Sequence, residues 1–264
     1  MNANIHIRNF INIAKGRTVR FGYDPKEKMY WAVEAGSMGQ TGVLRRHANF
    51  NRIESLYTLG IQKRSKDLFE SYCLAHIDFR VGDVIIDCGA NSGDLYMSLS
   101  PKAGASNYHC IEPNPADFSC LQYNCPEAHL HQVALSNCEG KLPFYVMTDT
   151  ADSSMIDQGK DVGSILVDAV RLDKFVAALG LGHVKLLKVE AEGYEPEVLM
   201  GCEGMLSKCK YIAVDGGHER GPNLDQTLTF AANFLARKGF EMVDINFVWS
   251  RALFANNNLL LDEP

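Results

Sequence analysis

The residues best placed to do chemistry follow a short apolar segment, Val84-Ile85-Ile86, which runs into Asp87, Gly89 and Gly93. Glycine allows a backbone to approach a ligand closely, so Gly89 would face a ligand, whereas Gly93 would let the next helix pack on the strand. In open parallel sheets, ligands bind beyond the carboxyl ends of the strands. The segment therefore predicts a ligand site at a strand-to-helix turn.

The spacing of the glycines indicates which ligand this turn accepts. A dinucleotide-binding turn has the pattern G-x-G-x-x-G, which seats a pyrophosphate on a helix N-terminus. Here two glycines stand four apart, and Asp87 before them would repel a diphosphate and favour a cationic group. Glu112 ends the next apolar segment, where a carboxylate can accept hydrogen bonds from both ribose hydroxyls. The pattern indicates a ligand that contains a nucleoside.

Three pieces of the sequence resemble the FkbM family of class I S-adenosylmethionine-dependent methyltransferases, over about residues 82–239. They are Asp87-Cys88-Gly89-Ala90-Asn91-Ser92-Gly93, Ile111-Glu112-Pro113-Asn114-Pro115, and Leu187-Lys188-Val189-Glu190-Ala191-Glu192-Gly193-Tyr194-Glu195. The family usually has Asp at the position of Glu190. The resemblance implies O-methylation of a sugar, glycan or natural product. It also implies a cofactor site in which Asp87, Gly89, Ala90, Asn91 and Gly93 surround the methionine part, Glu112 and Asn114 the ribose, and Val133 and Ala134 the adenine edge.

The acceptor side is expected at the end of the strand predicted over Val184–Val189. Lys188, Glu190 and Glu192 alternate there, so they point to one side if the chain stays extended. A hydroxyl must lose its proton as it is methylated, and a carboxylate or imidazole within hydrogen-bond reach can accept it. His218, in a glycine-rich segment, is the second candidate base because its ordinary pKa is near ~6.5. Lys188 is a third candidate, if burial beside the cofactor lowers its pKa.

A divalent metal is an alternative that the sequence leaves open but does not favour. Carboxylates and an imidazole are acceptable ligands for such a cation. The residues that could provide them are Glu190, Glu192, Asp215 and His218.

The bulk composition excludes several classes of protein. The formal net charge is −6, and basic residues cluster only in pairs such as Arg45-Arg46, so a large nucleic-acid footprint is not expected. No signal peptide and no run of 18 apolar residues is present, which predicts a cytoplasmic protein with no membrane span. The eight cysteines form no C-x-x-C pair, and we expect them to be reduced and mostly buried.

The pattern of apolar segments after residue 79 alternates between strands and helices, which predicts an α/β fold with a doubly wound, mostly parallel sheet of seven strands. A hairpin over 241–254 should be the only antiparallel part. Before residue 79, the sequence predicts a hairpin over 18–36 and two helices over 51–77. We therefore divide the chain into an N-terminal lid or acceptor-binding extension, 1–78, and a cofactor-binding domain, 79–264. An acidic loop, Asp149 to Asp161, is expected between two further strands.

Three other functions are compatible with a nucleoside-binding α/β fold. A nicotinamide-dependent oxidoreductase is disfavoured by the missing middle glycine and by Asp87. A non-catalytic scaffold would not need to keep Asp87, Gly89, Gly93 and Glu112 together. A nucleic-acid methyltransferase is disfavoured by the acidic balance and by the absence of an N-P-P-Y tetrapeptide.

Overall fold

The computed structural model of the chain describes residues 3–36, 42–147, 153–159 and 163–260. Its centre is a seven-stranded sheet with the order β14-β15-β11-β10-β4-β5-β6. β10 pairs in parallel with both β4 and β11, whereas β15 is antiparallel to both of its neighbours. The predicted doubly wound α/β fold and its single antiparallel hairpin are therefore confirmed. The strands are β4 (Ile85–Cys88), β5 (Tyr108–Ile111), β6 (His129–His131), β10 (Val184–Val189), β11 (Cys209–Asp215), β14 (Phe240–Asn246) and β15 (Arg251–Asn256).

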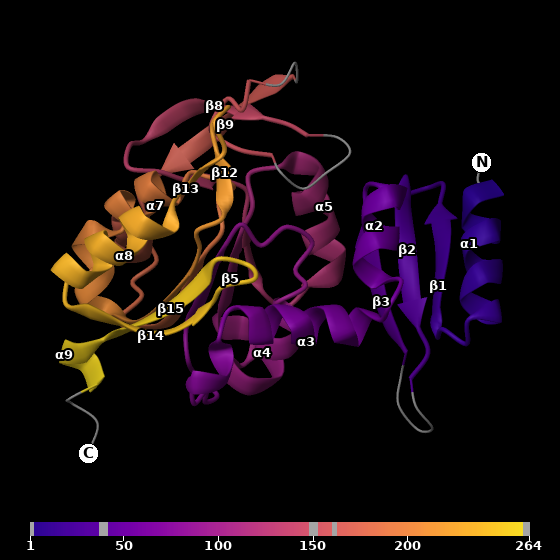
Figure 1. The fold of residues 1–264 in the computed structure, drawn as a ribbon, viewed down its shortest axis with the longest axis horizontal. Helices are drawn as coiled ribbons and strands as arrows, with labels where there is room; N and C mark the ends of the chain where they lie inside the picture. Colours follow the sequence, from indigo (N-terminus) through magenta and orange to yellow (C-terminus); the bar gives the residue numbers. More distant parts are fainter. Residues whose placement is uncertain (1–2, 37–41, 148–152, 160–162, 261–264) are drawn as a thin grey trace.

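The central strands are buried on both faces because helices cover both sides of the sheet. In β10, Leu187 packs into one apolar cluster and its neighbour Leu186 into another, as the alternation of side chains along a strand requires. Figure 1 shows α7 and α8 on one side of the sheet and α3 and α4 on the other. The helices of this part are α4 (Tyr96–Ala103), α5 (Pro115–Asn124), α6 (Leu172–Ala178), α7 (Glu195–Gly201), α8 (Leu228–Arg237) and α9 (Asn257–Leu260), with the 3-10 helices η1 (Leu74–His76), η2 (Ala105–Asn107) and η3 (Glu203–Lys208).

The N-terminal residues form a small antiparallel sheet with its own helices, beside the central sheet (Figure 1). The predicted hairpin and the two helices after it are present, but a third strand and a first helix were not predicted. The elements are α1 (Ala3–Ala14), β1 (Val19–Asp24), β2 (Met29–Glu34), β3 (Val43–His47), α2 (Phe50–Tyr57) and α3 (Ile61–Ser71).

A buried arginine joins this N-terminal part to the turn after β4. The Arg45 side chain is only 2% exposed. Its guanidinium donates to the carbonyl oxygens of Ser92, at 2.6 Å, and Asn124, at 3.1 Å. The Asn124 side chain in turn accepts from the Arg46 backbone N–H at 2.8 Å. Since these bonds are buried and charge-assisted, the N-terminal sheet is fixed to the predicted cofactor loop.

A second small sheet contains β7 (Ala134–Leu135), β9 (Ser164–Val170) and β8 (Gly140–Tyr145). The apolar run over 130–135 would be expected to form one strand, but the chain leaves the central sheet after His131 and joins this one at Ala134. Of the predicted loop 149–161, only residues 153–159 are described; the rest of that prediction lies outside the described residues. β12 (His218–Arg220) pairs with β13 (Asp225–Gln226), and α8 begins after this pair, at Leu228.

All eight cysteines are free thiols and seven of them are buried, as predicted. Among the described residues, no helix is long and apolar enough to cross a membrane.

Candidate active site

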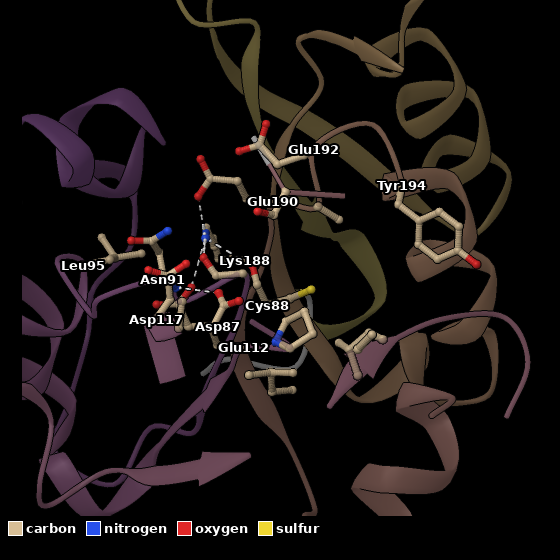
Figure 2. Close-up of a pocket in the computed structure, with 18 of the residues that line it drawn as sticks. Asp87, Cys88, Asn91, Leu95, Glu112, Asp117, Lys188, Glu190, Glu192 and Tyr194 are labelled. Atoms are coloured by element: carbon tan, nitrogen blue, oxygen red, sulfur yellow. Dashed lines mark hydrogen bonds and ion pairs between the residues drawn. The ribbon is translucent and has the colours of Figure 1, made fainter. Parts of the chain in front are cut away.

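A deep pocket opens at the carboxyl ends of β4, β5 and β10, and it contains most of the predicted site residues (Figure 2). The predicted residues that line it are Asp87, Gly89, Ala90, Asn91, Glu112, Val133, Ala134, Lys188, Glu190 and Glu192. The pocket therefore brings together the residues predicted for the cofactor and those predicted for the acceptor side.

Gly89 stands where the ends of two neighbouring strands come closest. Its φ is +75°, and an added Cβ would lie 2.0 Å from the Glu190 carbonyl oxygen. Its N–H donates to the Ile111 carbonyl at 3.0 Å. A side chain at this position would push β4 away from β10, so the glycine is required by the sheet as well as by the pocket.

Glu112 is a buried carboxylate held by two backbone donors. Its side chain accepts from the N–H groups of Asn91, at 2.9 Å, and Asn114, at 2.8 Å. Burial, and then the nearby carboxylate of Asp117, raise the pKa of Glu112 to about 8. Burial likewise raises the pKa of Asp117 to about 6. Asp117 also lines the pocket. It was not identified from the sequence, because it lies in the first turn of α5 and not at the end of a strand.

The two carboxylate oxygens of Asp87 have different surroundings. Oδ2 accepts from the Tyr108 hydroxyl at 2.7 Å. Oδ1 is buried 3.1 Å from Lys188 Nζ, yet among the described residues no donor reaches it with hydrogen-bond geometry. A buried polar atom of this kind normally has a partner. The ammonium of a methionine part, with three donors, fits this position, and a diphosphate does not.

Two of the predicted cofactor residues lie outside the pocket lining. A Cβ on Gly93 would lie 2.2 Å from Cys125 Sγ, so this glycine allows the turn to pack against α5. Asn114 caps α5 by accepting from the Ala116 N–H at 3.0 Å, and it reaches the site only through its backbone N–H to Glu112. Both residues support the pocket from behind.

Lys188 is the hub of a buried charge network, shown by the dashed lines in Figure 2. Its Nζ lies 3.1 Å from Asp87 Oδ1 and 2.7 Å from Glu190 Oε2, and it donates to the carbonyl oxygens of Cys88 and Gly89. Burial works to lower the pKa of Lys188, but Asp87 and Glu190 outweigh it and raise that pKa above its ordinary value. The expected lowering of this pKa is therefore wrong in this structure, and Lys188 is an ammonium.

Glu190 is held between two cations. Its Oε2 contacts Lys188, and its Oε1 lies 3.0 Å from Arg251 Nη2. Burial opposes ionisation, but Lys188 and Arg251 together hold the pKa of Glu190 well below its usual range. Arg251 also contacts Asp215 Oδ2 at 2.7 Å, and burial raises the pKa of Asp215 to about 6. Arg251 was not identified as a site residue from the sequence, because its partners are 36 and 61 positions away along the chain.

The positions of Glu192 and His218 differ from those expected from the sequence. Glu192 has a φ of +49°, so the chain turns instead of staying extended, but the residue still lines the pocket. His218 is exposed on β12, with Nδ1 3.2 Å from the Leu224 carbonyl oxygen, and is not among the pocket residues. The glycine before this segment, Gly216, instead makes room for Leu228, because a Cβ would approach that residue to 2.4 Å.

The four residues proposed for a divalent metal do not form a common ligand set. Within the described ranges, no group of three or more His, Cys, Asp or Glu side chains is arranged to hold a metal ion. Glu190 and Asp215 are instead neutralised by Arg251, which provides the positive charge that a cation would supply.

Comparison with known proteins identifies the family of the chain. The profile of the methyltransferase FkbM domain matches residues 87–242, more than half of the chain. The chain is 26% identical to 2-O-methyltransferase NoeI of Sinorhizobium fredii, covering 58% of this chain and 71% of that protein. It is 27% identical to 31-O-demethyl-FK506 methyltransferase FkbM of Streptomyces tacrolimicus (60% and 71%), and 28% identical to hexuronic acid methyltransferase AglP of Haloferax volcanii (50% and 55%).

Among solved structures, a methyltransferase FkbM from Methylobacillus flagellatus KT is 17% identical with a TM-score of 0.48, and the match covers 79% of this chain and 56% of that one. The family match replaces the alternative of a nicotinamide-dependent oxidoreductase and identifies S-adenosylmethionine as the cofactor. The chain belongs to the FkbM family of S-adenosylmethionine-dependent methyltransferases.

Proposed function

We propose that this enzyme methylates a hydroxyl group of a sugar, glycan or natural-product acceptor. The names of three relatives support this, since they describe O-methylation or action on a hexuronic acid. The observation that carries the proposal is that two carboxylates, Glu190 and Glu192, line the same pocket as the cofactor residues Asp87 and Glu112. S-Adenosylmethionine supplies an electrophilic methyl group with a good leaving group, so the protein must provide alignment and a proton acceptor.

Glu192 is the residue we assign as proton acceptor. Efficient general bases have a pKa near the working pH. Lys188 is an ammonium, and Glu190 is a weak base because two cations stabilise its charge. His218 lies outside the pocket lining. Glu192 is the remaining candidate, a carboxylate that lines the same pocket as Glu190.

Glu190 then has a positioning role. Its carboxylate is fixed by Lys188 and Arg251, so it can accept a hydrogen bond from the acceptor hydroxyl without moving. Lys188 contacts Asp87 and Glu190 at the same time. The ammonium therefore ties the carboxylate on the cofactor side to the carboxylate on the acceptor side at a fixed spacing.

We further propose that residues 1–78 act as an acceptor-binding extension. Its helices contribute Arg52, Leu56, Arg64, Leu68 and Tyr72 to the pocket. The aromatic and apolar side chains among them suit the face of a sugar. The cytoplasm is the proposed compartment, because free thiols persist where the environment is reducing.

The test is a transfer assay with labelled S-adenosylmethionine across glycans, nucleotide sugars and polyketide-like alcohols, with matched amines, in chelator. Hydroxyl acceptors should be methylated and the amines should not. Glu192→Gln should reduce the rate by roughly 10² to 10⁴ and remove the acidic limb of the pH profile, with S-adenosylhomocysteine affinity unchanged.

Full activity of Glu192→Gln would remove Glu192 as the base. Methylation restricted to amines would overturn O-transfer itself. Loss of all transfer in chelator, restored by a divalent metal, would show that a cation, not the carboxylate alone, activates the hydroxyl.

A further inference from the structure

The cofactor brings a carboxylate, and none of the residues predicted to hold the cofactor is a cation. Asp87 and Glu112 are carboxyl groups, and Gly89, Asn91, Val133 and Ala134 carry no charge. A carboxylate in a half-buried pocket needs a positive or strongly donating partner. We propose that the guanidinium of Arg64, on α3, binds the carboxylate of the methionine part of S-adenosylmethionine.

Among the described residues, three cationic side chains line the pocket: Arg52, Arg64 and Lys188. Lys188 is already committed, because its ammonium contacts two carboxylates and two carbonyl oxygens. Of these three cations, the two arginines can therefore meet a third carboxylate.

The two arginines lie at different ends of the cofactor. Arg52, on α2, is close enough to Asp117 to lower the pKa of that carboxyl, and Asp117 in turn acts on Glu112, the ribose-binding residue. Arg64 instead contacts Asp94, in the loop that continues from Gly89 and Asn91. That loop faces the methionine part, so position favours Arg64 over Arg52, although the buried Arg52 Nε also has no hydrogen bond among the described residues.

Arg64 is oriented before any ligand arrives. Its Nε lies 3.4 Å from Asp94 Oδ2, while Asp94 Oδ1 contacts Arg45 at 3.4 Å and accepts from the Tyr57 hydroxyl. Asp94 is thus a buried, immobilised anchor. Within the described part of the chain, the guanidinium of Arg64 makes no further hydrogen bond, and its side chain is 30% exposed. Its two Nη groups therefore remain to bind a carboxylate in the bidentate manner that suits arginine.

The face of α3 that lines the pocket carries a cationic, an apolar and an aromatic side chain in that order. Arg64, Leu68 and Tyr72 follow one another at intervals of four along α3 and its C-cap, so they form one row on the helix face, and all three line the pocket. The Tyr72 ring lies over Arg251, with 4.3 Å between guanidinium carbon and ring centroid, at the acceptor-side network. The cationic end of the row lies at the loop and the aromatic end at Glu190.

The test compares two ligands that differ only in the amino-acid part. S-Adenosylhomocysteine has the carboxylate, and 5′-methylthioadenosine lacks it but keeps the adenosine. By calorimetry, Arg64→Gln should weaken binding of S-adenosylhomocysteine roughly 10- to 100-fold, and of 5′-methylthioadenosine less than about twofold. Arg64→Lys should recover part of the loss. Arg52→Gln is the matched control and should show no such selectivity.

The second ligand also separates binding from a disturbed loop. Asn91, in the same loop, donates to Glu112, so a displaced loop would weaken both ligands equally. Equal losses, no loss, or a selective loss in Arg52→Gln instead would each overturn the assignment. No acceptor is needed, so the result is independent of the proposed O-methylation.

Discussion

The two sides of the pocket each hold a buried glutamate, and the two behave in opposite ways. Glu112, on the cofactor side, is bonded by two backbone N–H groups, and its pKa is raised to about 8. Glu190, on the acceptor side, is bonded by Lys188 and Arg251, and its pKa is lowered. The same residue type at similar strand ends thus differs because of its partners: dipoles in one case and full charges in the other.

This difference separates the roles proposed for the two sides. If ribose hydroxyls bind to Glu112 as proposed, they add hydrogen-bond donors to its carboxyl group, so the ligand helps to determine the ionisation of Glu112. The acceptor side is neutralised by the protein's own cations and is fixed in advance. A rigid acceptor side suits a reaction in which alignment supplies much of the acceleration.

The largest effect should come from removing the cation of the acceptor side. Arg251→Met leaves Glu190 and Asp215 without their shared partner, and breaking a buried ion pair in this way costs about 3–5 kcal/mol of unfolding free energy. Denaturant unfolding measures it. Lys63→Ala, which removes an exposed pair with Asp67, is the control and should cost about 0.5 kcal/mol or less. Equal losses in the two variants would mean that the acceptor side is not held by its charges.

A smaller effect is expected on the cofactor side. Glu112→Gln should weaken S-adenosylhomocysteine binding by about 1.5–3 kcal/mol per charged hydrogen bond lost. Because the pKa of Glu112 is about 8 without ligand, the group is mostly protonated at pH 7. Ribose hydroxyls favour its ionised form, so binding should tighten as the pH rises towards 8 and should release up to about one proton at pH 7.

Calorimetry in two buffers of different ionisation enthalpy counts these protons. The release should vanish in Glu112→Gln and shrink in Asp117→Asn, which removes the second-largest cause of the raised pKa. An unchanged proton count in Glu112→Gln would show that the two glutamates do not differ as described.

The smallest effect is expected at His218, which lies on neither side. His218→Ala should change kcat/KM by less than about twofold, since an exposed histidine outside the pocket lining contributes no proton transfer. A loss of a hundredfold or more would restore it as the base and displace Glu192.

Much of the fold was predictable because its signals are local. The strands of the central sheet are short apolar runs, and the turn with Gly89 and the strand end with Glu112 are read from neighbouring residues. β3 was missed because adjacent Arg45 and Arg46 do not look like a buried strand. Arg45 is nevertheless buried, since the carbonyl oxygens that it meets lie 47 and 79 positions away.

The site was predictable in its parts but not in its connections. Lys188 and Glu190 were named, but the sequence does not show that Arg251 and Asp87 complete their network. Asp117 was not recognised for the same reason, because it becomes a pocket residue only through the packing of α5. His218 was overvalued, because the glycines beside it serve packing against Leu228 rather than substrate access.

The position of Arg251 also has a consequence for the order in which the enzyme becomes functional during synthesis. Arg251 is the first residue of β15, which inserts between β11 and β14. A nascent chain that already contains every residue of the cofactor loop still has Glu190 and Asp215 repelling each other without their common cation. The acceptor side is therefore complete only when this late strand has entered the sheet. A chain that ends before Arg251 lacks the cation that fixes Glu190 and Asp215.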